Sequence, residues 1–217
     1  MKKERYFTAE NLESKSREML RDVEEIRRRH PLKLSSSGSA LLVLDMQNYF
    51  LDDSSHAFVP SAPAIIPGIV SLIDAFSRKN LPVIFTRHSN SEANAGMMSK
   101  WWHDLIKPEG HASEIIKELK AFPDATIQKE QYDAFYDTDL EARLRSGGIT
   151  QLVISGVMTH LCCETTARSA FVRGYEVFFC IDGTATYNEP FHRATLWNSA
   201  HGFAVPVLVN EMLDDLR

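Results

Sequence analysis

The stretch that decides the fold runs from residue 151 to residue 182: QLVISGVMTHLCCETTARSAFVRGYEVFFCID. It begins and ends with nearly continuous apolar runs, which are typical of strands buried on both faces of a sheet. Between these runs, residues 162–175 show a helical pattern. A strand, a helix and a second strand in this order indicate two parallel strands joined by a crossover helix.

The same alternation extends over the chain from residue 40 onward. Further apolar runs lie at residues 40–45, 82–86, 125–129 and 205–209, and further helical patterns at 64–79, 111–120, 138–148 and 189–201. Strands that alternate with helices predict a mostly parallel sheet covered by helices on both faces. We therefore expect an α/β fold with a single domain over residues 39–217.

The first 38 residues differ from this pattern. Residues 8–29 predict a helix, with Thr8 as its N-cap and Pro31 as its stop, and a short polar joint follows at 35–39. We expect residues 1–38 to form an N-terminal helical extension that packs on the main body or on a neighbouring subunit.

Composition limits the classes of partner. The chain has 217 residues and a net charge of −5, so it lacks the basic footprint expected for binding nucleic acid or an anionic membrane. Its three cysteines form no disulfide framework, which favours a reducing compartment. The charged N-terminus carries no apolar signal core. We expect a soluble, cytoplasmic homo-oligomer, a dimer or tetramer, that acts on a small molecule.

Reactive side chains gather where the predicted strands end. Asp45 ends the first strand, Lys129 ends the third, and Cys162 and Cys163 follow the fourth. Ligands of open α/β sheets bind at this edge. The first turn lacks the glycine patterns that cradle nucleotides, so no cofactor is expected. A cysteine at a helix start beside a lysine should have a lowered pKa, and a carboxylate can take its proton. Singly, each residue could instead be a packing residue, a cap or a solvated charge.

Three stretches resemble the signature blocks of the isochorismatase-like superfamily of cysteine hydrolases. They are LLVLDMQNYF (41–50), KEQYDAF (129–135) and LVISGVMTHLCCETTARSAFVRGYEVFFCIDGTAT (152–186). The resemblance implies a Rossmann-like, three-layer fold with a six-stranded parallel sheet. It also implies a catalytic triad of Asp45, Lys129 and Cys162.

The resemblance also distinguishes the two adjacent cysteines. It places the nucleophile three residues after Thr159, at Cys162, and leaves Cys163 as a packing residue. Successive helical residues point about 100° apart, so only one of the two can face a substrate. The resemblance further implies a cis peptide bond between Val157 and Met158, and an oxyanion hole made by the N–H groups of Met158 and Cys162. An ordinary trans turn is the alternative.

Departures from the family pattern indicate which kind of bond is hydrolysed. Isochorismatases proper, which cleave a vinyl ether, have glycine at the nucleophile position and cysteine one position later, whereas this chain has cysteine at both. We therefore expect cleavage of a C–N bond in an amide, ureide or carbamoyl group through an acyl-enzyme. Vinyl ether hydrolysis and a non-catalytic binding module with a degenerate site are the alternatives.

Metal and substrate contacts are predicted more loosely. Nicotinamidases carry an Asp-x-His metal motif after the second strand, but TRHSNSEANAG (86–96) lacks it, so no metal is expected. At most one of the adjacent tryptophans should face the substrate. The candidate pocket residues are Phe50, Trp101, Trp102, Tyr132 and Phe135 as apolar walls, and Gln47, Arg87, His88 and His160 as polar contacts.

Overall fold

The computed structural model describes residues 2–102, 104–119 and 126–217. Within these ranges it has one six-stranded sheet in the order β3-β2-β1-β4-β5-β6, and every neighbouring pair is parallel. The strands are β1 (Ser39–Leu44), β2 (Val83–His88), β3 (Thr126–Lys129), β4 (Gln151–Val157), β5 (Glu176–Ala185) and β6 (Val205–Val207). The predicted α/β fold with a six-stranded parallel sheet is confirmed.

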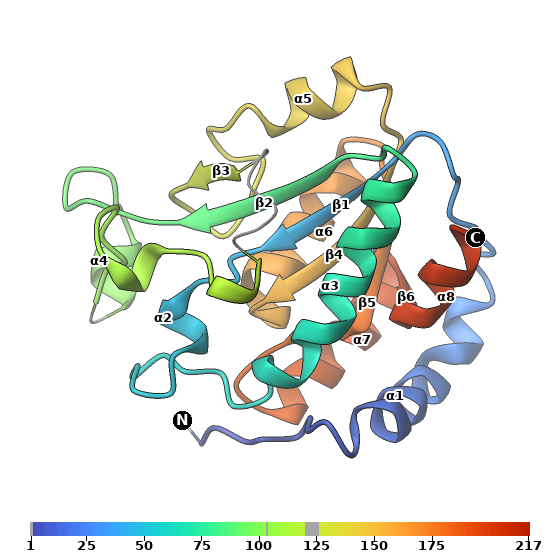
Figure 1. Ribbon diagram of the computed structural model, residues 1–217, viewed down its shortest axis with the longest axis horizontal. Helices are drawn as coiled ribbons and strands as arrows, with labels where there is room; N and C mark the ends of the chain where they lie inside the picture. Colours follow the sequence, from blue (N-terminus) through green and yellow to red (C-terminus); the bar gives the residue numbers. More distant parts are fainter. Residues whose placement is uncertain (1, 103, 120–125) are drawn as a thin grey trace.

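Helices cover both faces of this sheet. Figure 1 shows α3 in front of the sheet and α6 and α7 behind it, while α8 packs on α3 and α1 packs on α7. The α-helices are α1 (Leu12–Arg27), α2 (Asn48–Leu51), α3 (Ala62–Arg78), α4 (Met98–Trp101), α5 (Leu140–Ser146), α6 (Glu164–Val172), α7 (Glu189–Gly202) and α8 (Val209–Asp215). Two 3-10 turns, η1 (His111–Ser113) and η2 (Lys117–Leu119), and one π-helical turn, η3 (Thr159–Cys163), complete the described elements.

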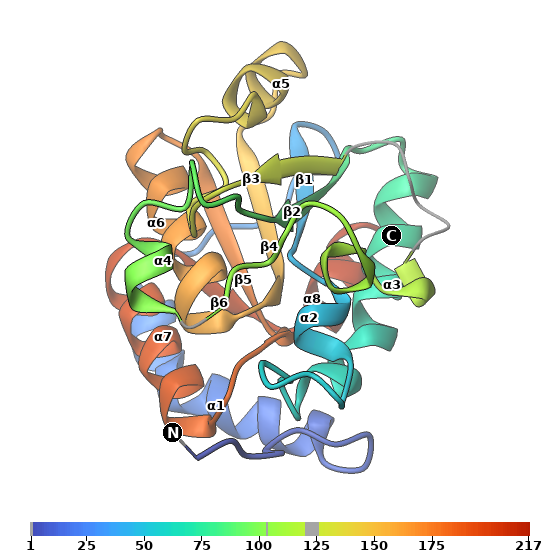
Figure 2. The same cartoon turned by 90° about the vertical axis from the view of Figure 1, so that its left-hand side faces the viewer.

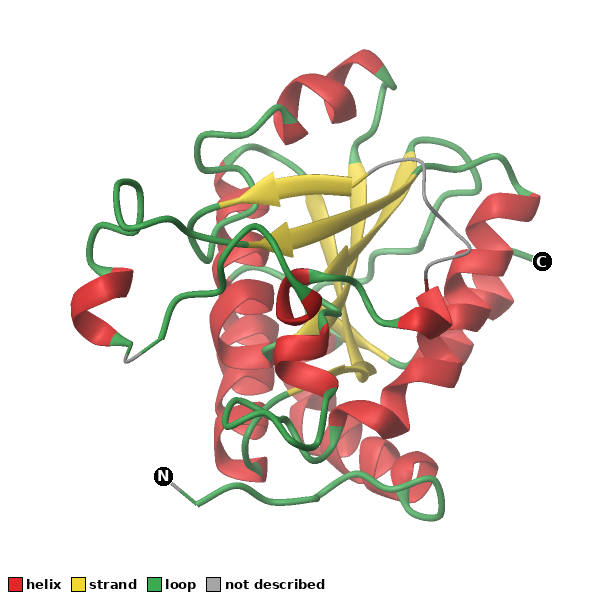
Figure 3. Cartoon of the chain, turned by 60° about the vertical axis from the view of Figure 1, so that its left-hand side comes forward, coloured by secondary structure: helices red, strands yellow, loops and turns green. Residues whose placement is uncertain are grey.

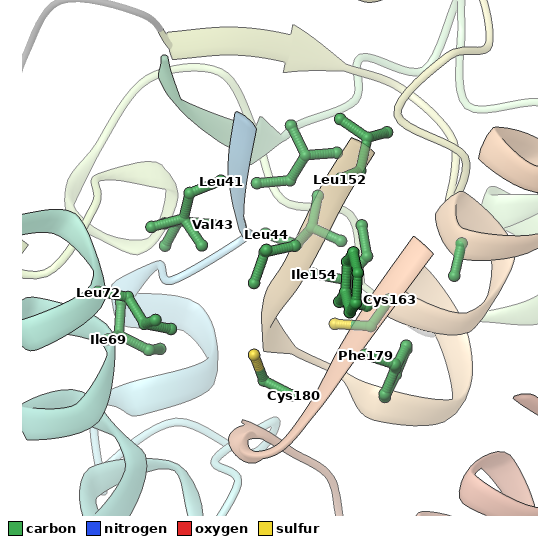
Figure 4. Close-up of a cluster of buried hydrophobic side chains, with 14 of the residues drawn as sticks. Leu41, Val43, Leu44, Ile69, Leu72, Leu152, Ile154, Cys163, Phe179 and Cys180 are labelled. Atoms are coloured by element: carbon green, nitrogen blue, oxygen red, sulfur yellow. The ribbon is translucent and has the colours of Figure 1, made fainter. Parts of the chain in front are cut away.

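The core forms between α3 and the central strands. All residues of β1 and β4 are buried, as expected for apolar strands with helices on both sides. On α3, Ile65, Ile69, Leu72 and Phe76 recur at helical spacing and are fully buried. Figure 4 shows the side chains of Ile69 and Leu72 beside the strands. Each such side chain contributes roughly 1.5–3 kcal/mol by leaving water.

The N-terminal extension packs on the main body of the same chain. Met19 and Val23 of α1 are buried, and so are Tyr6 and Phe7 in the segment before it. All four belong to the same hydrophobic cluster as the sheet. The predicted helix over residues 8–29 is therefore present as α1, and the segment that precedes it is also part of the core.

Two predicted elements differ from the structure. Residues 111–120 were expected to form a helix, but they form η1 and η2, because the intervening Ile115 pairs with Gln47 and the N–H of Ile116 bonds to Met46. Residue 120, and residue 125 of the predicted third strand, lie outside the described residues. The last predicted strand, 205–209, ends at Val207 because the N–H of Val209 bonds to Asp182 and begins α8.

The carboxyl ends of the strands point to one edge of the sheet. Figure 1 shows the arrowheads of β1, β2, β3 and β4 directed toward this edge, and Figure 3 shows two arrowheads of the sheet from another side. Figure 2 views the molecule from the side where α2 and α4 lie. The candidate site residues lie here. None of the helices in the described part of the chain has the length and apolar character needed to cross a lipid bilayer.

Candidate active site

Asp45, Lys129 and Cys162 come together at the carboxyl edge of the sheet. Nζ of Lys129 lies 2.7 Å from Oδ2 of Asp45 and 3.4 Å from Sγ of Cys162. A third bond, 2.9 Å long, runs from the same Nζ to the backbone carbonyl of Gln131. The Asp45 and Lys129 side chains are fully buried, and Cys162 is 5% exposed. The three residues predicted as a triad are therefore neighbours, although their strand ends are far apart in sequence.

A close approach between β1 and β4 makes this arrangement possible. Leu44 is opposite Gly156 in the register, and a Cβ on Gly156 would lie only 2.1 Å from the Leu44 carbonyl oxygen. Gly156 also has φ +109°, which favours glycine. Because Asp45 follows Leu44 and the cysteine turn follows Gly156, this contact brings the carboxylate close to the thiol.

Thr86 fixes the Asp45 carboxylate. Its hydroxyl donates to Oδ1 of Asp45 at 2.6 Å and accepts from the Asp45 backbone N–H at 3.1 Å. Asp45 has φ 49°, a left-handed conformation that aspartate tolerates better than most residues. The sequence prediction did not include Thr86. Its position at the end of the predicted second strand, beside Asp45, was the signal that could have identified it.

The Asp45–Lys129 pair is ionised. Burial favours the neutral form of each group, but each charge stabilises the other more strongly. As a result, burial acts to raise the pKa of Asp45, while Lys129 lowers it to below its usual range. Burial acts to lower the pKa of Lys129, but Asp45 and Cys162 raise it above its usual range. A buried carboxylate and a buried ammonium therefore lie beside the thiol.

The expected low pKa of Cys162 is wrong. Burial raises the pKa of this thiol, the negative charge of Asp45 raises it further, and Lys129 opposes both without overcoming them. The prediction expected Lys129 to offset the Asp45 charge and still favour the thiolate, whereas Asp45 largely neutralises the lysine at 2.7 Å. Cys162 also lies in the π-helical turn η3, before α6 begins at Glu164. The Cys162 thiol is thus protonated at rest.

The turn that carries Cys162 begins at a cis peptide bond between Val157 and Met158, as the resemblance implied. Within η3 the two cysteines face different surroundings. Cys162 lines a cavity, whereas Cys163 is fully buried in the hydrophobic cluster. Figure 4 shows the Cys163 side chain near those of Ile154 and Phe179. The core position of Cys163 agrees with its predicted packing role.

The cavity above Cys162 is mostly apolar and has a volume of about 270 Å³. Such a volume suits a small molecule and not a polymer. Its walls come from the loop after β1, the long segment after β2 and the turns after β3, β4 and β5. The lining residues are Tyr49, Phe50, His56, Ala57, His88, Asn90, Met98, Trp102, Asp104, Leu105, Ile106, Tyr132, Met158, Leu161, Cys162 and Tyr187.

Four of the predicted contacts, Phe50, His88, Trp102 and Tyr132, line this cavity. Trp102 donates its indole N–H to the Tyr132 hydroxyl at 2.7 Å, whereas Trp101 is 74% exposed and lies outside the lining. Of the adjacent tryptophans, Trp102 therefore faces the cavity.

The remaining predicted contacts lie elsewhere. Gln47 is fully buried and exchanges hydrogen bonds with the backbone of His88, so it joins β1 to β2. The Arg87 side chain donates to Gln128 on the neighbouring strand. Phe135 stacks on Tyr175, and His160 stacks on Phe191 while bonding to Thr186. These side chains support the site but do not line the cavity.

Sequence reasoning missed several lining residues, including Tyr49, Asn90, Ile106 and Tyr187. Tyr49 lies inside the first signature block, and Tyr187 follows the carboxyl end of β5, so position at the active edge was an available signal. Asn90 and Ile106 belong to the long segment after β2. A hydrogen bond from the Asn90 N–H to the Ile106 carbonyl holds two distant parts of this segment together. No pattern in the sequence predicts that bond.

The cavity carries little positive charge. No lysine or arginine among the described residues lines it, and its acidic member is Asp104. Burial and the charge of Lys129 lower the pKa of His88 to about 4, so its imidazole is neutral at pH 7. The described wall thus offers a bound anion neither a lysine nor an arginine as a partner.

The residues at the position of the nicotinamidase metal motif do not fit that role. The segment 86–96 at the end of β2 lacks the Asp-x-His pattern, and Asn90 within it donates its side-chain N–H to the Glu130 carbonyl. Over the described ranges, no three His, Cys, Asp or Glu side chains group so as to hold a metal ion. We derive no catalytic step through a metal.

A family model described as the isochorismatase domain matches residues 39–211. The chain belongs to the isochorismatase family. This result confirms the resemblance drawn from the three signature blocks. The match begins where the predicted main domain begins, and it leaves the N-terminal segment outside.

Individual relatives are consistent with this membership. Nicotinamidase 3 of Arabidopsis thaliana is 43% identical over 185 residues, covering 83% of this chain and 88% of that protein. The ureidoacrylate amidohydrolase of Variovorax paradoxus is 31% identical over 182 residues, covering 72% of each. Among solved structures, a cysteine hydrolase from Pseudomonas syringae pv. phaseolicola 1448A has a TM-score of 0.82 at 24% identity, covering 85% of this chain and 95% of that one. The structural likeness supports the fold.

Proposed function

We propose that this protein is a cysteine-dependent amidohydrolase that cleaves the C–N bond of a small molecule through an acyl-enzyme. The observation that carries the proposal is the contact of Lys129 with both Asp45 and Cys162, directly beside an apolar cavity that Cys162 lines. The curated relatives named above, a nicotinamidase and an amidohydrolase, support C–N cleavage.

In the proposed first half-reaction, Sγ of Cys162 attacks the carbonyl carbon of the amide. The resting thiol is protonated, so its proton passes to the Asp45 carboxylate as the C–S bond forms. We assign the N–H groups of Met158 and Cys162 to the oxyanion of the tetrahedral intermediate. Asp45 then returns the proton to the leaving nitrogen, the C–N bond breaks, and a thioester remains on Cys162.

In the second half-reaction, water attacks the thioester while Asp45 accepts a proton from it. The C–S bond breaks, the acid product leaves, and the proton returns to the Cys162 sulfur. Lys129 keeps its charge throughout, because its ammonium is bonded to Asp45 and to the Gln131 carbonyl. Its role is to hold the carboxylate in place and to stabilise negative charge on sulfur.

The cavity favours an uncharged substrate. Burying an unpaired carboxylate is costly, and the described lining offers neither lysine nor arginine to pair with it. Its aromatic walls, which include Phe50, Trp102 and Tyr132, suit a flat ring. We therefore propose a neutral, planar carboxamide of about the size of nicotinamide as the substrate class. Isochorismate and ureidoacrylate carry carboxylates and fit this wall less well.

The test is a panel of substrates assayed for ammonia or acid release. Nicotinamide represents neutral aromatic amides, ureidoacrylate an anionic ureide, and isochorismate the vinyl ether. We expect kcat/KM for the neutral amide to exceed that for either anion by about 100-fold or more. Cys162→Ala should abolish amide turnover, and the matched variant Cys163→Ala should retain most of it.

Three results would contradict the proposal. Turnover of the vinyl ether that survives in Cys162→Ala would favour the isochorismatase-type reaction with Asp45 alone. A preference for the anionic ureide would overturn the substrate class while leaving the amidohydrolase assignment standing. Absence of turnover with every amide and ureide in the panel would favour a binding module.

We also propose a cytoplasmic location and a homo-oligomeric state. All three cysteines are free, which supports a reducing compartment. Three large apolar side chains on α6 and α7 are exposed to solvent, namely Phe171, Val172 and Trp197. Their exposure supports a contact with another subunit on this face. Size-exclusion chromatography with light scattering tests the second part, and a monomer would contradict it.

A further inference from the structure

The N-terminal segment packs beside η3 (Thr159–Cys163), the catalytic turn that carries Cys162. Tyr6 is 5% exposed and Phe7 is fully buried, and both pack against the imidazole of His192 on α7. Tyr6 also lies before residues 39–211, the region that matches the isochorismatase domain. The features that Tyr6 contacts, however, belong to that domain and surround the turn that carries Cys162.

Two hydrogen bonds hold the first residues of the catalytic turn. The Thr159 hydroxyl lies 3.1 Å from Nδ1 of His192, and Nδ1 of His160 lies 2.6 Å from the Thr186 hydroxyl. Thr159, Thr186 and His192 are fully buried, so water does not compete for these bonds. The turn that begins at Thr159 is thereby tied to α7 on one side and to the end of β5 on the other.

The Tyr6 hydroxyl connects these two ties. It lies 3.0 Å from Nδ1 of His192, which is the partner of Thr159. It also accepts the backbone N–H of Thr186 at 3.0 Å, and Thr186 is the partner of His160. One oxygen atom therefore bonds to both anchors of the catalytic turn. Removing it would leave the N–H of Thr186 without this partner and would take away one of the two hydroxyl groups that contact Nδ1 of His192.

Neighbouring residues hold Tyr6 in this position. The N–H of Glu4 donates to the carbonyl of Tyr187 at 2.7 Å, and the N–H of Phe7 donates to the Ser61 hydroxyl at 3.1 Å. Lys3 donates to the carbonyls of His56 and Phe58. Because His56 and Tyr187 line the cavity, the same segment also braces its wall.

We propose that Tyr6 is a positioning residue for catalysis, which acts through His192 and Thr186 to orient the turn that carries Cys162. The N-terminal segment then completes the active site and is more than an extension attached to it. The inference uses the proposed hydrolase function for one of its readouts, and a second readout is independent of any substrate.

The variant Tyr6→Phe removes only the hydroxyl and keeps the buried ring. Its matched control is Tyr175→Phe. Tyr175 is also 5% exposed, its hydroxyl bonds to none of the described residues, and it lies just before β5, at the opposite edge of the sheet. We expect Tyr6→Phe to lower kcat about fivefold to tenfold, the rate equivalent of one buried hydrogen bond, while KM stays within about twofold. The control should change neither value.

Hydrogen exchange supplies the substrate-independent readout. Backbone amides in the peptide that contains residues 158–163 should exchange faster in Tyr6→Phe than in the wild type, and exchange in α3 and β1 should be unchanged. If no amide is turned over, the proposed function fails, and this localised acceleration alone decides the role of Tyr6. Three outcomes would overturn the role: unchanged kcat with unchanged exchange, an equal loss of kcat in Tyr175→Phe, or acceleration spread over the whole sheet.

Discussion

The ammonium of Lys129 and the carboxylate of Asp45 form an ion pair, 2.7 Å between Nζ and Oδ2, with both side chains fully excluded from solvent. The pair brings opposite charges beside the Cys162 thiol without leaving a free cation there. This explains how the site can hold an ionised carboxylate beside a Cys162 thiol that stays protonated. It also makes each member of the pair necessary to the other.

Lys129→Met should destabilise the protein by about 3–5 kcal/mol, because the variant leaves the Asp45 carboxylate buried without its partner. Urea unfolding at pH 7 measures the change. The control is Lys33→Met, which removes the same charge from an exposed side chain. Similar unfolding midpoints for the two variants would contradict the buried pair.

Asp45→Asn should change turnover and thiol reactivity in opposite directions. Turnover should fall by about 10²–10⁴-fold, because the amide cannot accept the Cys162 proton. Alkylation of Cys162 by iodoacetamide at pH 7 should become faster, because loss of the Asp45 charge leaves Lys129 unopposed and lowers the pKa of the thiol. In the wild type, alkylation should accelerate only above the usual pKa of cysteine.

Rates measured between pH 6 and pH 10, with peptide mapping, test this prediction. Asp53→Asn is the control, since Asp53 is exposed and lies outside the active-site cavity. Superimposable alkylation profiles for wild type and Asp45→Asn would show that the carboxylate does not control the thiol. Preferential alkylation of Cys163 or Cys180 would show that the wrong cysteine has been chosen.

Asp182→Asn should stabilise the protein at neutral pH and not in acid. Burial raises the pKa of Asp182 to about 6, so the folded state holds this proton more tightly than the unfolded state does. The resulting stabilisation is complete below the unfolded pKa and is lost as pH rises through about 6. Asparagine can still accept the N–H of Val209. With allowance for the partial exposure of Asp182, we expect the free energy of unfolding to rise by about 1–2 kcal/mol at pH 7.5.

Urea unfolding of wild type and Asp182→Asn at pH 7.5 and pH 3.5 checks this sign. The difference in unfolding free energy should shrink toward zero at the lower pH. There the Asp182 carboxyl is largely protonated and is therefore as uncharged as the asparagine amide. An equal gain at both pH values would mean that ionisation of Asp182 is not responsible.

Turnover should survive dialysis against a chelator. Within the described part of the chain, no three His, Cys, Asp or Glu side chains group so as to hold a metal ion. Assays before and after dialysis, with metal content measured in parallel, give the comparison. Activity lost on dialysis and restored by Zn²⁺ or Mn²⁺ would contradict this expectation.

The strands and the proximity of Asp45, Lys129 and Cys162 were predictable because both follow from position along the sequence. A continuous apolar run such as residues 40–44 indicates a strand buried on both faces, and parallel strands bring residues such as Asp45 and Lys129 to one edge. The protonation of Cys162 was not predictable, because it depends on how closely Asp45 neutralises Lys129.

Contacts between segments that are far apart in the chain could not be predicted from the sequence either. Tyr6 and Thr186 are joined by one hydrogen bond across most of the chain, and no periodicity marks such a pair. Trp102 and Ile106 reach the cavity through the conformation of a long loop, which hydrogen bonds such as that between Asn90 and Ile106 determine. The helix expected at residues 111–120 failed for a related reason, since pairing of Ile115 with Gln47 overrides the local helical pattern.

The most direct test of the account is to trap the acyl-enzyme. The protein is mixed with a neutral aromatic amide, quenched in acid within one turnover, and analysed by intact-protein mass spectrometry followed by peptide mapping. The account predicts a mass increase equal to the acyl group, located on Cys162, absent in Cys162→Ala and retained in Cys163→Ala. Turnover with an adduct on another residue would contradict the account. So would turnover of an activated ester, which acylates faster than the thioester is hydrolysed, without any adduct on the protein.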